Sequence, residues 1–352
     1  MQTPWYATRE EIKAELDVKE TARSNGRIDR ALADATDAVH GLTHRVFYPV
    51  LTTRRFDWPP RMGSTPWILR LGSNEVISVT SLASGPVAIP AAAYLLRRGD
   101  DLDEPPYTRI ELRLGSSASF GNGDTSQEDI AVVGLFGYRN DETPVGALAA
   151  PVQSTADTTI TVDGPASAAL GVGSLLRVGE ERMIVTGRRQ LDTGQGFGDS
   201  MGSINSDVSI GVADGTAYAV GETILRDSER MLVTEIAGNT LTVQRAWDGS
   251  ILAAHTDSAI YAPRVLTVTR GALGTTAATH TSGSTVARWD APGGVRQLCL
   301  AEALVDLLQG RSGYARTAGS GDNERETSGK GIADLRDRVY ARYGRKARTT
   351  AV

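Results

Sequence analysis

The sequence contains a single cysteine and four histidines, and it has no apolar run of about 18 residues, the length that a membrane-spanning helix needs. One thiol cannot close an internal disulfide, which suits a reducing compartment such as the cytoplasm. The first residues form neither a basic nor an apolar leader, so we expect no secretion signal. These absences favour a protein that works without a membrane and stays where it is made.

An excess of positive charge is also missing, because the formal net charge is −5 at pH 7. Such a balance gives no general attraction for nucleic acid. The 352 residues are 40% hydrophobic and 22% charged, which is ordinary for globular protein and long enough for about two domains. Basic residues are concentrated only near the C-terminus.

Recognisable catalytic and metal-binding patterns are absent or out of context. Gly198–Gly202 matches G-x-S-x-G, but a glycine-rich loop precedes it where a nucleophile elbow needs an apolar strand. His40 and His44 are one helical turn apart, yet no further ligands complete a metal set. Cys299 lies in an apolar helical run and is predicted to be a small core residue. We therefore expect no enzyme activity, no cofactor and no metal.

One β-rich unit occurs twice between residues 158 and 288, and the second copy lies inside the first. The segment Glu181–Thr186 (ERMIVT) is repeated as Glu229–Thr234 (ERMLVT). The second half of the first copy appears only beyond the second copy, where Leu266–Arg270 (LTVTR) matches Leu241–Arg245 (LTVQR). Insertion of a folded module at a loop tip leaves this pattern, because a tip accepts it without disturbing the core.

The two histidines of the repeat, His255 and His280, occupy matching places in the two copies. A catalytic site is rarely made twice in this manner, so we predict that each histidine makes the same structural hydrogen bond. Trp247, by contrast, has Ala272 as its counterpart. The repeats therefore share no common aromatic platform.

The remaining sequence predicts helices and antiparallel strands. Thr8-Arg9-Glu10-Glu11 is a capping box that opens a helix over about 8–17. Apolar residues at helical spacing (Ile28, Leu32, Ala35, Val39, Leu42, Val46) predict a second helix over about 27–46, and a third follows Pro292. Alternating residues predict strands at 67–71, 76–82, 109–114 and 130–136. The predicted class is α+β: a small helical bundle with antiparallel β-hairpins or sheet, plus a nested, duplicated all-β insertion.

A basic amphipathic helix follows a segment rich in Gly, Ser, Thr, Asn and Glu, which reads as a flexible linker. Such a tethered helix is suited to fold onto a partner, and we expect it to be disordered or frayed until it does. We predict that it docks through an apolar stripe flanked by arginines. The proposed docking residues are Ile332, Leu335, Arg336, Arg338, Val339, Arg342, Tyr343 and Arg345.

Six segments outside the repeats occur in a characteristic order and spacing: residues 6–16, 39–48, 53–58, 76–82, 106–112 and 133–138. Together with the helix after 293 they resemble the head-to-tail connector, or adaptor, family of long-tailed, siphovirus-type bacteriophages. The long nested insertion is a departure from that family, in which a short loop is common.

The resemblance implies a non-enzymatic virion protein that is assembled in the host cytoplasm and located in the neck between capsid and tail. It further implies a ring of about twelve identical subunits below the portal protein, with a head-completion or stopper protein beneath. Double-stranded DNA would pass through the central channel transiently and without sequence specificity. In such adaptors the C-terminal segment usually docks onto the portal.

The domain boundaries expected on this basis are a discontinuous host domain at 1–146 and 290–309, a β-rich insertion at 147–289 interrupted by the second copy at about 207–262, a flexible linker at 310–331, and a docking helix and tail at 332–352. An alternative of a different class is a virion-surface or host-carbohydrate binding module, suggested by Trp247 and Trp289 on the β units.

Overall fold

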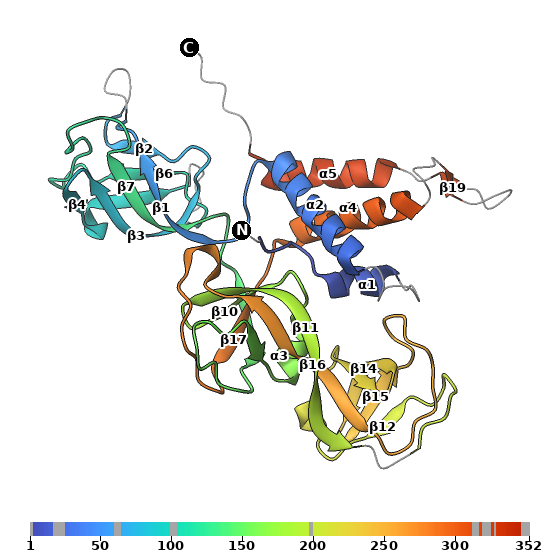
Figure 1. The fold of residues 1–352 in the computed structure, drawn as a ribbon. Helices are drawn as coiled ribbons and strands as arrows, with labels where there is room; N and C mark the ends of the chain where they lie inside the picture. The colour runs from blue at the N-terminus through green and yellow to red at the C-terminus, as the bar shows by residue number, and fades with distance from the viewer. Residues whose placement is uncertain are drawn as a thin grey trace. The chain divides into compact units, whose positions relative to one another are not determined.

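The computed structural model describes residues 3–16, 25–59, 65–98, 104–196, 200–311, 317–318, 325–326 and 329–345. It has the mixed composition of an α+β protein, with separate helices and antiparallel sheets (Figure 1). The chain forms two compact units. The first contains residues 1–42, 142–272 and 276–343, and the second contains residues 43–141, 273–275 and 344–352.

Helix α1 (Arg9–Leu16) opens the first unit and confirms the predicted capping box. The Glu11 carboxylate accepts a hydrogen bond of 2.7 Å from the backbone N–H of Thr8, and the Thr8 hydroxyl accepts one of 3.3 Å from the N–H of Glu11. These bonds satisfy backbone donors that the first turn of a helix leaves without partners. Ile12 is fully buried beneath them.

Helices α2 (Asn25–Thr43), α4 (Gly293–Arg311) and α5 (Gly329–Tyr343) complete the helical part of the first unit. Helix α2 ends three residues before the predicted end, because His44 adopts a positive φ of 53° that a helix cannot contain. Val46 lies beyond that end and is 41% exposed. The buried side chains at helical spacing are Ile28, Leu32, Ala35 and Val39 on α2, and Val295, Leu298, Cys299 and Ala303 on α4.

The outer β subdomain comprises residues 142–189 and 265–289, of which all but 273–275 belong to the first unit. Its strands surround a single apolar core, and β8 and β9 meet through the antiparallel bridge between Leu148 and Val162. A short helix, α3 (Gly164–Ala169), is capped by the side chain of Asp163. The strands are β8 (Glu142–Ala147), β9 (Thr159–Thr161), β10 (Leu175–Val178), the first half of β11 (Glu181–Gly196), the second half of β16 (Ala259–Thr269) and β17 (Thr285–Trp289).

The inner β subdomain comprises residues 190–264 and has its own core. Its strands are β12 (Ser209–Gly211), β13 (Thr223–Arg226), β14 (Glu229–Ala237) and β15 (Thr240–Gln244), together with the remaining halves of β11 and β16. Strands β11 and β16 pair along most of their length, with register shifts near residues 186, 190 and 194. One continuous ribbon therefore serves both subdomains (Figure 1).

The second unit is built from two antiparallel sheets, β1-β7-β3-β4 and β2-β6-β5, around one core. All four strands predicted here are present, and the alternation along β7, buried at every second residue, follows from one face meeting the core. The strands are β1 (Val50–Phe56), β2 (Ile68–Arg70), β3 (Val76–Ser84), β4 (Val87–Ile89), β5 (Tyr94–Arg97), β6 (Arg109–Leu112) and β7 (Ile130–Phe136).

The two compact units do not coincide with the domain boundaries expected from the sequence. The helices pack in one unit with residues 142–272, whereas residues 43–141 form the other unit. The reason is a set of backbone bonds from the N-terminal segment to the outer subdomain. Trp5 N–H donates to the carbonyl of Gly173 at 3.0 Å, and Arg9 N–H donates to that of Val172 at 3.1 Å. The Glu10 carboxylate accepts from Val172 N–H at 2.8 Å. These long-range bonds leave no trace in local sequence patterns.

Candidate functional site

The predicted docking helix is present as α5, but its apolar stripe is already covered within the chain. Leu335, Val339 and Tyr343 are all less than a tenth exposed. Side-chain atoms of Val339 and Tyr343 lie over Gly294 of α4, where a β-carbon would come within 3.8 Å and 3.1 Å of them. The expectation of a frayed helix with an open stripe is therefore wrong for this structure, because α4 supplies the apolar partner.

The charged residues of the predicted docking set divide into two groups. Arg336 is held by α4, with its guanidinium 2.5 and 2.7 Å from the two carboxylate oxygens of Glu302. Arg345 forms an ion pair of 3.1 Å with Glu75 in the second unit. Arg338 and Arg342 are exposed one turn apart, and Ile332 is half-buried. Arg336 is exposed as well, but its guanidinium is paired with Glu302, so Arg338 and Arg342 are the better candidates for contact with a partner.

Most of the expected linker at 310–331 and the tail after Arg345 lie outside the described residues. Within that stretch, strands β18 (Thr317–Ala318) and β19 (Arg325–Glu326) pair antiparallel. Helix α5 begins at Gly329, three residues before the predicted Ile332.

The most elaborate polar site of the outer subdomain is centred on the buried carboxylate of Glu181. Arg270 donates to both of its oxygens, at 2.7 and 2.8 Å. The backbone N–H groups of Gly271 and Ala278 donate at 2.9 and 3.0 Å, and His280 Nε2 lies 2.8 Å away. Every acceptor position of the carboxylate is thus used, which is what a buried charge requires.

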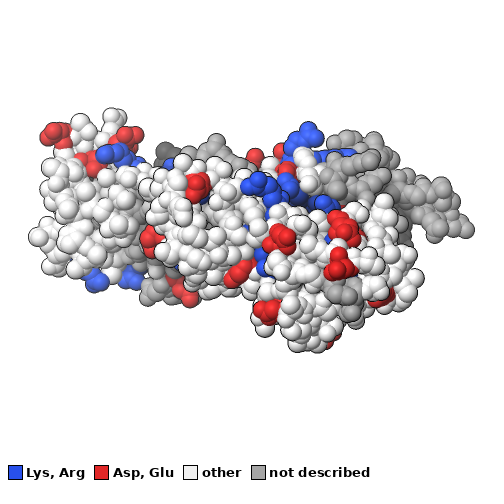
Figure 2. All heavy atoms as spheres, turned by 60° about the horizontal axis from the view of Figure 1, so that its bottom comes forward, with Lys and Arg blue, Asp and Glu red and all other residues white. Residues whose placement is uncertain are grey.

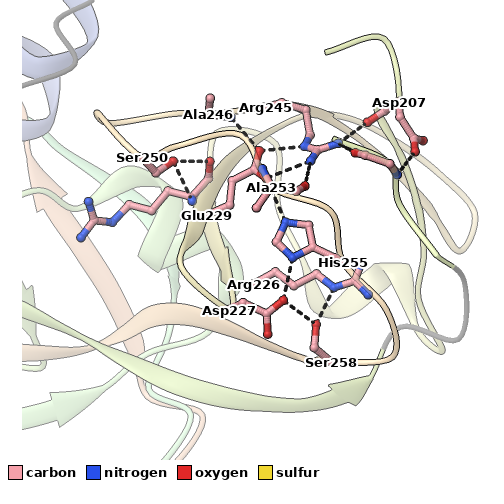
Figure 3. A network of polar contacts seen from close by, with 12 residues as sticks. Asp207, Arg226, Asp227, Glu229, Arg245, Ala246, Ser250, Ala253, His255 and Ser258 are labelled. Atoms are coloured by element: carbon pink, nitrogen blue, oxygen red, sulfur yellow. Dashed lines mark hydrogen bonds and ion pairs between the residues drawn. The ribbon is translucent and has the colours of Figure 1, made fainter. Parts of the chain in front are cut away.

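The inner subdomain contains a matching network around Glu229 (Figure 3). Arg245 donates to its two oxygens at 2.7 and 2.8 Å, and the N–H groups of Ala246 and Ala253 donate at 2.9 and 3.0 Å. His255 Nε2 lies 2.8 Å from the carboxylate. The same contacts at nearly the same distances occur in both subdomains, so the predicted repeated hydrogen bond of the two histidines is confirmed.

Both glutamates are ionised because of these partners. Burial acts to raise the pKa of Glu229, but the hydrogen bonds from Arg245, Ala253, His255 and Ala246 outweigh it and lower the pKa to about 2. The pKa of Glu181 is lowered to about 2 in the same way by its own partners. Carboxylates that stay ionised and fully hydrogen-bonded serve as structural anchors and are poor general bases.

The inner network has one addition, a second carboxylate on the far side of the histidine. Asp227 Oδ2 lies 2.6 Å from His255 Nδ1, and Ser258 donates to the same oxygen at 3.3 Å (Figure 3). The matching outer residues are Gly179 and Gly283. Each ring nitrogen of His255 thus lies within hydrogen-bond distance of a different carboxylate. Sequence reasoning missed this site, although comparing the two copies residue by residue would have found it.

Two other candidates from the sequence, Cys299 and His40, are buried and half-buried, respectively. Burial raises the pKa of the Cys299 thiol to about 11, so it is not an activated nucleophile. His40 Nε2 lies 2.5 Å from the Tyr6 hydroxyl, and burial lowers the pKa of this histidine. Of the G-x-S-x-G segment, Gly198 and Asp199 lie outside the described residues.

Among the residues placed in the structure, no group of histidine, cysteine, aspartate and glutamate side chains is arranged to hold a metal ion. None of the helices in the described ranges has the length and apolar character needed to cross a bilayer. Comparison with protein-family models, curated proteins and solved structures finds no match to this chain.

Proposed function

We propose that this chain is a structural head-to-tail adaptor of a tailed phage virion, in which about twelve copies form a ring under the portal. The ring would carry the stopper and tail, and DNA would pass through it. The proposal rests on the resemblance of the six ordered segments. The structural observation that supports it best is α5, a helix packed on α4 whose outer side presents Arg338 and Arg342.

We also propose that the two β subdomains arose by nested duplication. The contact pattern supports this origin, because in each subdomain a glutamate from the first repeated segment pairs with an arginine and a histidine from the second. The pairing partners of Glu181 lie beyond the inner subdomain in sequence. A loop-tip insertion has this connectivity, since the host strands must continue on both sides of it.

Portal docking through α5 is now expected to use its outer face. Arg338 and Arg342 would meet acidic portal surface and contribute orientation and association rate more than net affinity. Leu335, Val339 and Tyr343 would hold α5 on α4 and would not contact the portal, since they are buried in the free chain. Mixed surface charge elsewhere on the chain suits the lining of a channel through which DNA passes without binding. On the face drawn in Figure 2, basic side chains have acidic ones close by.

The decisive experiment is complementation of a phage that lacks the protein with the double variant Arg338→Glu and Arg342→Glu. We expect folded protein by circular dichroism but few joined, infectious particles. The matched control is Arg30→Glu, an exposed arginine on α2. Normal titre with the double variant would show that α5 is not the docking element.

Electron microscopy and mass measurement of isolated necks test the ring itself, and a single copy per particle would exclude an adaptor ring.

A further inference from the structure

A groove of about 740 Å³ lies in the first unit and is lined by residues of α1 and of both β subdomains. Its sheet side includes Arg188 and Gln190 of β11 and Arg230 of β14. Its helix side includes Lys13. A volume in this range is typical of small-molecule sites. The adaptor function proposed above does not use it.

The loop that carries Trp247 and Asp248 into the groove lining is held rigidly from behind. Glu229 accepts from Ala246 N–H, and the backbone N–H of Trp247 donates to the carbonyl of Arg230 at 2.8 Å. Ala246 and Asp248 both have positive φ angles, 55° and 49°, which define one tight backbone path. A loop whose backbone is fixed in this way presents its side chains at constant positions.

The outer subdomain has the same loop but different side chains. Leu273, the counterpart of Asp248, has φ 54°, so the backbone path is repeated. The counterpart of Trp247 is Ala272, which is buried. Trp247 is half-buried and Asp248 lines the groove. The inner loop thus differs from its duplicate by an aromatic and an acidic side chain, both facing one cavity.

The lining contains six basic and four acidic side chains, and each basic one forms an ion pair with a carboxylate. Asp248 is shared between Lys13 at 2.9 Å and Arg230 at 3.3 Å. Arg188 lies 3.6 Å from Glu10 and donates to the carbonyl of Ser167 at 2.6 Å. Its Nε atom is buried without a hydrogen-bond partner among the described residues. The groove therefore offers donors beside acceptors, and its basic groups already have carboxylate partners.

These features of the lining indicate which class of ligand the groove could bind. A nucleotide or phosphate brings about two negative charges and would have to displace the carboxylates that already pair with the basic residues of the lining. A sugar ring matches better, because neighbouring hydroxyls both donate and accept, as arginine and aspartate pairs require. Its C–H face can stack on an indole such as that of Trp247, or on Trp5, which also lines the groove. We propose that this groove is a saccharide-binding site, independent of the adaptor function.

The test uses the full chain and four probes: maltotriose, the N-acetylglucosamine trimer, galactobiose and a rhamnose disaccharide. Saturation-transfer NMR at about 10 mM sugar detects affinities in the millimolar range. We expect at least one probe to receive saturation and to change tryptophan fluorescence. Trp247→Ala should weaken binding about tenfold, the equivalent of one stacking contact of about 1.4 kcal/mol.

Folding does not confound this variant, because Ala272 occupies the same backbone position in the outer subdomain. Asp248→Asn, which keeps the shape but loses the Lys13 ion pair, should also weaken binding. The control is Tyr261→Ala, which removes an exposed aromatic side chain of the inner subdomain outside the groove lining. The proposal is overturned if no probe binds, or if Trp247→Ala binds as wild type or Tyr261→Ala binds as weakly as Trp247→Ala.

Discussion

The outer and inner β subdomains use the same buried ion-pair network to hold the same loop, yet they differ in what surrounds it. Around Glu181 the histidine has one carboxylate partner, whereas around Glu229 it has two. The outer loop carries Ala272, and the inner loop carries Trp247. The comparison teaches that both copies of the repeat share the network as a scaffold, while the residues on its rim differ and can have separate roles.

The largest expected effect comes from breaking either network at its arginine. Arg270→Met and Arg245→Met each leave a buried glutamate without its counter-charge, which typically costs about 3–5 kcal/mol. We expect Arg270→Met to loosen both subdomains, because the inner strands extend from β11 and β16. Arg245→Met should loosen the inner one alone. Hydrogen exchange by mass spectrometry distinguishes the two, and equal loosening of the outer subdomain by Arg245→Met would contradict this hierarchy.

Acid should weaken both networks over the same pH window. The pKa of each glutamate is lowered in the folded state from an ordinary 4.5 to about 2. The associated stability is therefore fully present above about pH 4.5 and is lost as the pH falls toward 2, by roughly 3 kcal/mol per glutamate. Urea unfolding between pH 2 and 7 measures this loss. In Glu229→Gln the change in the free energy of unfolding between pH 2 and 7 should be about half of that in wild type. An unchanged pH dependence would mean that other groups cause the acid sensitivity.

A smaller effect should follow from exchanging the residue that distinguishes the two histidines. Asp227→Gly gives the inner subdomain the outer residue and should cost about 1 kcal/mol by removing one charge-assisted hydrogen bond. Gly179→Asp is the reverse change. A β-carbon at Gly179 meets nothing closer than His280 Cε1 at 3.9 Å, and aspartate tolerates its φ of 58°.

Thermal unfolding of these two variants and of the double exchange checks the prediction. Comparable stability losses in Asp227→Gly and in the neighbouring Ser228→Gly, which has no part in the network as described, would mean that backbone freedom and not the histidine contact is responsible.

The smallest effect is expected from removing the inner subdomain altogether. Arg189 and Val265 are antiparallel partners on β11 and β16. Replacing residues 190–264 by Asn-Gly should therefore join them in a two-residue hairpin. The remaining chain should keep its helical circular dichroism signal and unfold within a few degrees of wild type. Aggregation or loss of the outer core would mean that the inner subdomain is not a nested insertion.

Local features of the fold were predictable from the sequence, because their causes are local. The capping box at Thr8 and Glu11 starts α1 where the pattern places it. Alternating residues define β3 and β7, and the matched repeats anticipate the equivalent histidine contacts. Capping and periodicity act over a few residues, so their signatures are contiguous in the chain.

Only the tertiary structure decided which surfaces are covered. The apolar stripe of α5 reads as a docking face, yet α4 covers it through Gly294. The N-terminal helix reads as part of a separate host domain, yet Trp5 and Glu10 bind the loop at Val172 and Gly173. An amphipathic pattern states that a face must be buried but not by what. The partner is set by shape and by backbone bonds between distant segments, which no local pattern records.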